Sequence, residues 1–255
     1  MSVARGSLYL GPNTLDFGAP GAIPELQDVL ALGVIRVAAR LEHWVAENAK
    51  TTRAFLKRVD AVQPLARPLQ SIGITELPRP PKGAAKAEPS RLGALLAPAL
   101  QGFDVGLISE AGLPAVADPG AGLVECAHGM AIKGVALPGP SSLLLALAAS
   151  GLNGQSFAFV GYLPVDGSER GARIRELEAQ SRRHSQTQLM IETPYRNAAL
   201  MGALLAHLNG STRVGLSCGL TLPNGFSRTD TVAGWKARPA DLPGDVPVVF
   251  SLLAS

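Results

Sequence analysis

Short apolar runs alternate with longer amphipathic segments along most of the chain. The apolar runs predict strands at 7–10, 34–39, 104–108, 134–137, 157–163, 188–192, 213–217 and 246–253. Between them, helical spacing and helix-start residues predict helices at 24–32, 42–59, 90–101, 141–150, 168–183 and 195–208. Strands that alternate with helices are typical of parallel or mixed sheets covered on both faces. The pattern therefore predicts an α/β fold.

The 255 residues allow either one large domain or two small ones. A break at Gly151-Leu152-Asn153-Gly154 separates the first strand–helix series from a second, strand-rich series. We therefore expect an N-terminal α/β domain at 1–152 and a C-terminal α/β domain at 153–255. Within the first, the stretch 78–91 is rich in Pro, Lys and Ala, which predicts a surface loop or a mobile lid.

Composition and charge narrow the class of protein. The formal net charge is only +3, so any contact with RNA must come from a local basic patch. Cys126 and Cys218 lie far apart without a CxxC-type partner, which predicts two reduced thiols and no metal site. Residues 1–5 lack the apolar core of a signal peptide, and the apolar run 143–149 is shorter than the roughly 20 residues of a membrane span. We expect a cytoplasmic protein that does not enter a membrane.

One Gly- and Pro-rich segment stands out as a candidate ligand loop. The chain carries no phosphate-loop, HExxH or GxSxG motif, and Gly120-Ala121-Gly122 is a poor dinucleotide fingerprint. The apolar strand that ends at Ile108, however, runs directly into the loop 109–120. Ligands in open α/β sheets bind at such strand ends, where Gly lets the backbone approach closely and Pro fixes the loop beforehand. An ordinary connecting loop is the alternative.

A second strand end has the same character. Pro138-Gly139-Pro140 follows the strand 134–137, and Ser141 or Ser142 is placed to cap the helix that comes next. A helix N-terminus offers free N–H groups and the positive end of the helix dipole to an anion. Plain helix capping by serine explains the same residues.

Taken together, five stretches resemble the tetrapyrrole methylase superfamily (class III methyltransferases). They are 109–114 with 118–120, 138–142, 146–152, 159–164 and 192–196. Within the superfamily, the chain most resembles the small-subunit ribosomal RNA methyltransferase I family, which methylates a cytidine ribose 2′-oxygen. The order and spacing of the stretches fit that family over nearly the whole chain.

The resemblance implies a specific architecture and cofactor. It implies two small α/β domains, a homodimer, and S-adenosylmethionine folded into the cleft between the domains, with its methionine carboxylate suited to a helix N-terminus. The cofactor-binding residues that it implies are Gly11, Pro12, Ser109, Glu110, Ala111, Val116, Ser141, Ser142, Glu192 and Leu220.

Departures from the family pattern concentrate on the substrate side. The first loop, usually Pro-x-x-Ile-Gly-Asn-Leu, is Gly11-Pro12-Asn13-Thr14-Leu15 here, and Glu110 replaces an Asp. The family's Ala-Glu-Asp-Thr-Arg-x-Thr is residues 46–52 here, with Asn, Ala and Lys where the family has Asp, Thr and Arg. Near the C-terminus, Arg-Glu-Leu-Thr-Lys becomes 218–222, which loses its charges. The cofactor-side motifs are therefore retained better than the substrate-side motifs.

Transfer of a methyl group to a hydroxyl benefits from a base and from charge stabilisation. On a helix from Glu42, Glu47 and Lys50 would lie one turn apart: Glu47 as proton acceptor, Lys50 against a phosphate or an alkoxide. An exposed ion pair is the alternative. Lys50, Arg53 and Lys57 also recur at helical spacing as a basic stripe for an RNA backbone. A solvated helix face explains that stripe equally, as it does a second set, Arg170, Arg173, Arg182 and Arg183.

Three functions follow from these patterns. The first is methylation of a ribose 2′-oxygen in ribosomal RNA, which the basic stripe favours. The second keeps the enzyme class but takes a tetrapyrrole or another small molecule as substrate. The third is a non-catalytic paralogue that binds the cofactor, favoured by the uncharged residues at Gly219 and Leu222.

Overall fold

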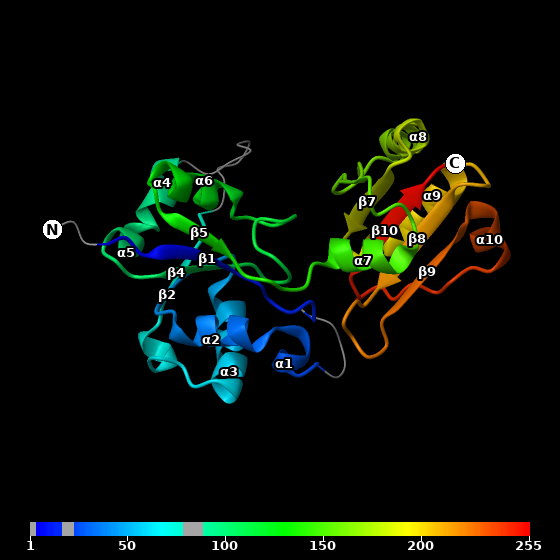
Figure 1. Cartoon of the computed structure of the whole chain (residues 1–255). Coiled ribbons are helices and arrows are strands. Elements are labelled where there is room, and N and C mark those ends of the chain that lie inside the picture. Colours follow the sequence, from blue (N-terminus) through cyan, green and yellow to red (C-terminus); the bar gives the residue numbers. More distant parts are fainter. Residues whose placement is uncertain (1–3, 17–22, 79–88) are drawn as a thin grey trace. The chain divides into compact units, whose positions relative to one another are not determined.

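The computed structural model describes residues 4–16, 23–78 and 89–255. These residues form two compact units, which meet in sequence between Pro140 and Ser141 (Figure 1). The predicted loop at 78–91 falls almost entirely outside the described residues. Helix α7 (Ser142–Ser150) belongs to the second unit because it packs on strands of that unit. The domain boundary at 152/153 stays a prediction.

The first unit is built on a five-stranded, fully parallel sheet in the order β3-β2-β4-β1-β5. Its strands are β1 (Ser7–Gly11), β2 (His43–Ala46), β3 (Gly73–Glu76), β4 (Val105–Ile108) and β5 (Lys133–Ala136). Since all five run in one direction, their carboxyl ends lie at the same edge of the sheet.

Helices cover both faces of this sheet, as the α/β prediction requires (Figure 1). One face packs against α1 (Leu26–Val29), α2 (Leu32–Arg40) and α3 (Ala49–Val62), with a 3₁₀ turn at Leu69–Ser71. The other packs against α4 (Pro89–Ala94), α5 (Ala97–Leu100) and α6 (Ala121–Gly129). Neighbouring residues of one strand serve opposite cores: Leu107 joins the α4–α6 side and Ile108 the α1–α3 side.

Two predicted elements in this unit were wrong. The β-branched run 34–39 is not a strand but part of α2, where Val34, Ile35, Ala38 and Ala39 are buried at helical spacing. The predicted helix 42–59 contains β2, and its helical part begins only after Asn48, whose side chain accepts from the N–H groups of Lys50 and Thr51. Short apolar runs are ambiguous between strand and helix, and tertiary packing decided both cases.

The second unit holds a mixed five-stranded sheet in the order β6-β7-β10-β8-β9. Its strands are β6 (Phe157–Phe159), β7 (Thr187–Glu192), β8 (Arg213–Cys218), β9 (Phe226–Thr231) and β10 (Val248–Leu253). One face packs against α8 (Gly167–His184), α9 (Asn197–His207) and α10 (Val232–Ala237). The other packs against α7. A 3₁₀ turn, Pro194–Arg196, leads into α9.

Strand β6 is shorter than the predicted 157–163, and β9 was not predicted. Strand β9, Phe-Ser-Arg-Thr-Asp-Thr, lies at the sheet edge with every residue at least partly exposed, so it carries no apolar pattern.

A buried carboxylate fastens α8 to the turn between α9 and β8. Glu178 is 5% exposed and accepts hydrogen bonds from the Asn209 backbone N–H and side-chain amide, each at 2.8 Å, and from the Thr212 hydroxyl. Every oxygen of this buried charge is therefore paired, which is the condition for tolerating it in a core.

We predict that Glu178→Ala lowers the free energy of unfolding by about 2–3 kcal/mol, because it leaves buried donors without acceptors. The matched control is Glu176→Ala on the same helix, where the exposed carboxylate pairs with Arg173 and the change should cost about 0.5 kcal/mol or less. Urea denaturation of both variants measures the difference. Equal losses would show that the Glu178 contacts do not hold this turn.

Candidate active site

The connections of two adjacent strands in the first sheet leave in opposite directions. From β1 the chain passes through α1 and α2 to β2, and from β4 it passes through α6 to β5, on the opposite face. The loops that follow β1 and β4 therefore leave the carboxyl edge toward opposite faces of the sheet. Such a switch point is where open α/β sheets form their ligand crevice.

Asn13 joins the loops of these two strands. Its side-chain amide donates to the carbonyl oxygens of Ser109 and Glu110, at 3.1 and 3.0 Å, and its backbone N–H donates to Gly112 O at 2.8 Å. Asn13 is 6% exposed, so these bonds are shielded from water. Asn13 was not predicted as a site residue, although its position directly after a predicted strand end was an available signal.

The loop after β5 approaches the same place. A Cβ atom at Gly139 would lie only 2.2 Å from the Cβ of Pro12, so this position requires glycine. Gly112 and Gly120 have φ values of 65° and 133°, which side-chain-bearing residues rarely adopt. The glycines of these loops thus serve close backbone approach and left-handed turns, as the sequence predicted for a ligand loop.

The structure brings together the predicted cofactor residues of the first unit. Gly11 ends β1 and Pro12 follows it, while Ser109, Glu110 and Ala111 follow β4. Val116, 45% exposed, lies further along the second of these loops.

Three carboxylates lie close together at this edge. The Oε2 atom of Glu47, at the end of β2, accepts from the Glu110 backbone N–H at 3.1 Å. Burial and then the Glu47 charge raise the pKa of Asp118 to about 6, against the influence of the Ser109 side chain. Burial and the same charge raise the pKa of Glu110, opposed by Thr51. Asp118 belongs to the motif 118–120 but was not predicted as a site residue. Its proximity to Glu47 and Ser109 depends on the folded chain.

The predicted relation between Glu47 and Lys50 was wrong. Glu47 lies before the helix, since Asn48 is the N-cap of α3, and its carboxylate contacts the Glu110 backbone. The spacing of the basic stripe was right, because Lys50, Arg53 and Lys57 are all exposed on α3.

The predicted cofactor residues of the second unit gather at a different edge, where β7 and β8 end. Leu220 and Ile191 pack against the apolar cluster that contains Leu143 of the first turn of α7. Glu192 ends β7; it is 6% exposed and its carboxylate lies 3.1 Å from the Arg196 guanidinium. Ser141 and Ser142 begin α7. Ser141 is the N-cap, as the sequence predicted, but its side chain makes no capping hydrogen bond.

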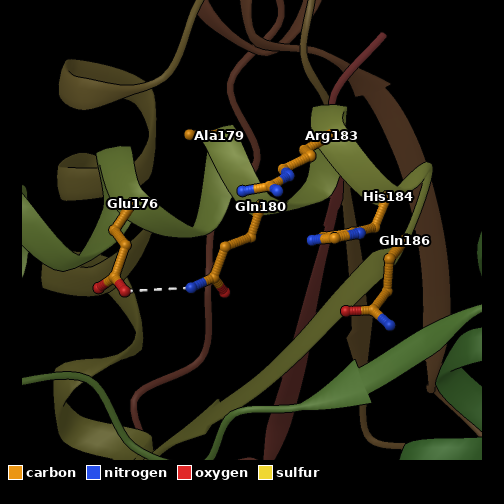
Figure 2. A pocket seen from close by; sticks show the side chains of 6 residues that line it. All are labelled: Glu176, Ala179, Gln180, Arg183, His184 and Gln186. Atoms are coloured by element: carbon orange, nitrogen blue, oxygen red, sulfur yellow. Dashed lines mark hydrogen bonds between the residues drawn. The ribbon is translucent and has the colours of Figure 1, made fainter.

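A hollow on α8 offers no comparable chemistry (Figure 2). It is lined by Glu176, Ala179, Gln180, Arg183, His184 and Gln186. The Glu176 carboxylate accepts from Gln180 at 3.0 Å, and none of the lining residues is buried. Within the second basic set, Arg173 pairs with Glu176, and Arg182 donates to the backbone oxygen of Ser255. This surface has the character of a solvated helix face.

Two other kinds of feature are absent from the described parts of the chain. Residues 4–16, 23–78 and 89–255 contain no cluster of His, Cys, Asp or Glu suited to a metal ion. Among the same residues, no helix is long and apolar enough to cross a membrane.

The chain is similar in sequence to several curated proteins that share one name. A protein named ribosomal RNA small subunit methyltransferase I from Mesorhizobium japonicum is 40% identical over 141 residues, 55% of this chain and 47% of the relative. A protein of that name from Escherichia coli O157:H7 is 33% identical over 188 residues, 65% and 64% of the two chains. The chain thus spans about half to two thirds of the length of these relatives. No family model matches it.

Solved structures share the fold over nearly the whole chain. A putative cobalamin synthesis related protein (CobF) from Corynebacterium diphtheriae matches with a TM-score of 0.59 at 16% identity, covering 98% of this chain and 99% of that one. Uroporphyrin-III-C-methyltransferase from Thermus thermophilus matches with a TM-score of 0.51 at 20% identity, covering 98% and 92%. The chain thus shares the fold of these two solved structures over nearly its whole length, and it is similar in sequence to proteins named ribosomal RNA small subunit methyltransferase I.

Proposed function

We propose that this protein is an S-adenosylmethionine-dependent methyltransferase that binds its cofactor at the carboxyl edge of the sheet of the first unit. The observation that carries the proposal is the junction of three Gly/Pro loops at the switch point of the first sheet, held by Asn13. These are the loops in which the superfamily motifs lie. The names of the curated relatives support the same activity.

The residues at the two edges fit this cofactor. In the first unit, Gly11, Pro12 and Ser109 are buried at the strand ends, and the glycines of the loops there let the backbone approach a ligand closely. In the second, α7 begins without a side-chain cap, so its first N–H groups suit a carboxylate. The complete proposed set is Gly11, Pro12, Ser109, Glu110, Ala111, Val116, Ser141, Ser142, Glu192 and Leu220.

We propose a ribose 2′-oxygen of ribosomal RNA as the methyl acceptor. When bound, S-adenosylmethionine supplies a methyl group that its sulfonium sulfur already activates. The protein then has to orient the hydroxyl, exclude water and accept one proton. Glu47 and Asp118 are the carboxylates that can accept it at the carboxyl edge of the sheet, and exposed Lys50, Arg53 and Lys57 can bind phosphates.

A small-molecule acceptor, such as a tetrapyrrole, is the second candidate. Three carboxylates lie at the edge where α3 begins, those of Glu47, Glu110 and Asp118. Their charges would repel a polyanionic small molecule that is placed among them. An uncharged turn at 218–222 instead suits a paralogue that binds the cofactor without turnover. We further propose a cytoplasmic homodimer, as the resemblance implies.

The first test concerns the cofactor. Ala111→Arg places a long side chain in the loop after β4 and should abolish binding of S-adenosylmethionine in calorimetric titration while circular dichroism stays unchanged. Ala179→Arg, an exposed substitution on α8, is the matched control and should bind like the wild type. Unchanged affinity in a folded Ala111→Arg protein would refute this placement.

The second test uses the pKa of Asp118, which is about 6 in the folded protein against an ordinary 3.8. A raised carboxyl pKa means that the folded protein holds this proton more tightly than the unfolded chain, so stability falls as the pH rises from about 4 to about 6. Asp118→Asn removes that loss.

The variant should therefore be more stable than the wild type by about 1–2 kcal/mol at pH 7.5, allowing for partial solvent screening, and by clearly less at pH 4. Urea denaturation at both pH values measures the two differences. A variant that is less stable than the wild type at pH 7.5 would contradict the assigned surroundings of Asp118.

The third test concerns the acceptor. Replacing Lys50, Arg53 and Lys57 by Ala should weaken binding to ribosomal RNA similarly across sequences and reduce the salt dependence by up to about three phosphate contacts. Arg173, Arg175 and Arg183 on α8, replaced together, form the control with the same loss of charge. If both triple variants bind RNA like the wild type, a small-molecule acceptor or a non-catalytic role becomes the better account.

A further inference from the structure

Arg58 of α3 reaches the segment that follows β1. Its Nη1 atom donates to Thr14 Oγ1 at 3.2 Å and to Asp16 Oδ2 at 3.0 Å, and its Nη2 atom donates to the Pro24 carbonyl oxygen at 2.9 Å. Thr14 and Asp16 are 4% and 7% exposed. One guanidinium thus joins three acceptors across 11 residues of chain, on the inner side of the helix that carries the exposed stripe.

The segment that Arg58 holds is the one that joins the loops at the switch point. Asn13, next to Thr14, bonds the carbonyl oxygens of Ser109 and Glu110. The Thr14 backbone N–H donates to the Asn13 side-chain oxygen at 2.9 Å, and Thr14 O accepts from the Gly112 N–H at 3.3 Å. Contacts therefore run without interruption from α3 through residues 13–16 to the loop after β4.

We propose that Arg58 is a positioning residue for the cofactor: it holds residues 11–16 in the conformation in which the backbone of Gly11 and Pro12 is ready to bind S-adenosylmethionine. This inference rests on the proposed function, because it takes that segment as part of the cofactor site. Arg58 itself is directed at Thr14, Asp16 and Pro24 and acts through them.

The chemistry of the contacts requires arginine. Its planar fork presents several N–H donors in fixed directions, whereas a lysine ammonium is a single point of charge on a flexible stem. Without the guanidinium, the buried Asp16 carboxylate loses its ion-pair partner and its surroundings must rearrange to hydrate it. A loop that has to be reordered on binding takes up its ligand more weakly than one already in place.

The first test is calorimetric titration of S-adenosylmethionine into Arg58→Gln, with Arg40→Gln as the matched control. Arg40 pairs with Asp104 at 2.6 Å in the same unit, but Asp104 directly precedes β4 and so lies at the amino edge of the sheet. Arg58→Gln should raise the dissociation constant about 10-fold by losing preorganisation, while Arg40→Gln should stay within about 2-fold. The dissociation constant of Arg58→Lys should lie between those of the wild type and Arg58→Gln. If Arg58→Gln does not fold, Arg58→Lys takes its place in the test.

The second test is hydrogen exchange without any cofactor. Amides at 11–16 and 109–112 should exchange faster in Arg58→Gln than in the wild type, and at wild-type rates in Arg40→Gln. Unchanged cofactor affinity or unchanged exchange in a folded Arg58 variant would overturn the proposal. A wild-type protein that binds no S-adenosylmethionine would refute the proposed function instead, and the exchange rates would then decide whether Arg58 holds the segment.

Discussion

The site in the first unit depends on one constraint, which is that the connections of two neighbouring parallel strands leave toward opposite faces of the sheet. β1 and β4 run side by side, and their connections leave toward opposite faces of the sheet. The backbone groups that emerge there need partners. Asn13 supplies them to Ser109 and Glu110 from within the first loop, and the other loops approach through glycines. These buried hydrogen bonds and close backbone approaches hold the loops together at the carboxyl edge.

Charge is distributed unevenly around the carboxyl edge of this sheet. The carboxylates of Glu47, Glu110 and Asp118 lie close together at the carboxyl edge, where burial and then the charge of Glu47 raise the pKa of Asp118 to about 6. The cations Lys50, Arg53 and Lys57 lie outside on the exposed face of α3. This separation suits an acceptor whose hydroxyl enters among the carboxylates while its phosphates stay on the helix surface. Arg58, on the inner side of the same helix, contacts the segment that follows β1.

The sequence predicted the fold class and the position of the Gly/Pro loops, because both follow from local patterns. Strands are predicted from the few residues that form them, and a tight loop is predicted from residues such as Gly112, Pro138 and Gly139 themselves. Segments 34–39 and 42–46 were misassigned because short apolar runs fit a helix or a strand equally well until tertiary packing selects one.

The remaining site features depend on contacts between distant parts of the chain. Asn13 meets Ser109 across 96 positions, and Arg58 meets Asp16 across 42. No spacing rule links such pairs, so their roles emerged only from the folded chain. The raised pKa of Asp118 likewise depends on Glu47, which lies on another strand end.

Hydrogen exchange of the wild-type protein with and without S-adenosylmethionine tests the central claim most directly. The account predicts that added cofactor slows exchange at 11–14, at 109–112 and in the first turn of α7, while α8 and its hollow stay unchanged. These segments contain the loop backbone and the uncapped helix start that are proposed to contact the cofactor. Protection confined to other segments, or no protection at saturating cofactor, would contradict the account.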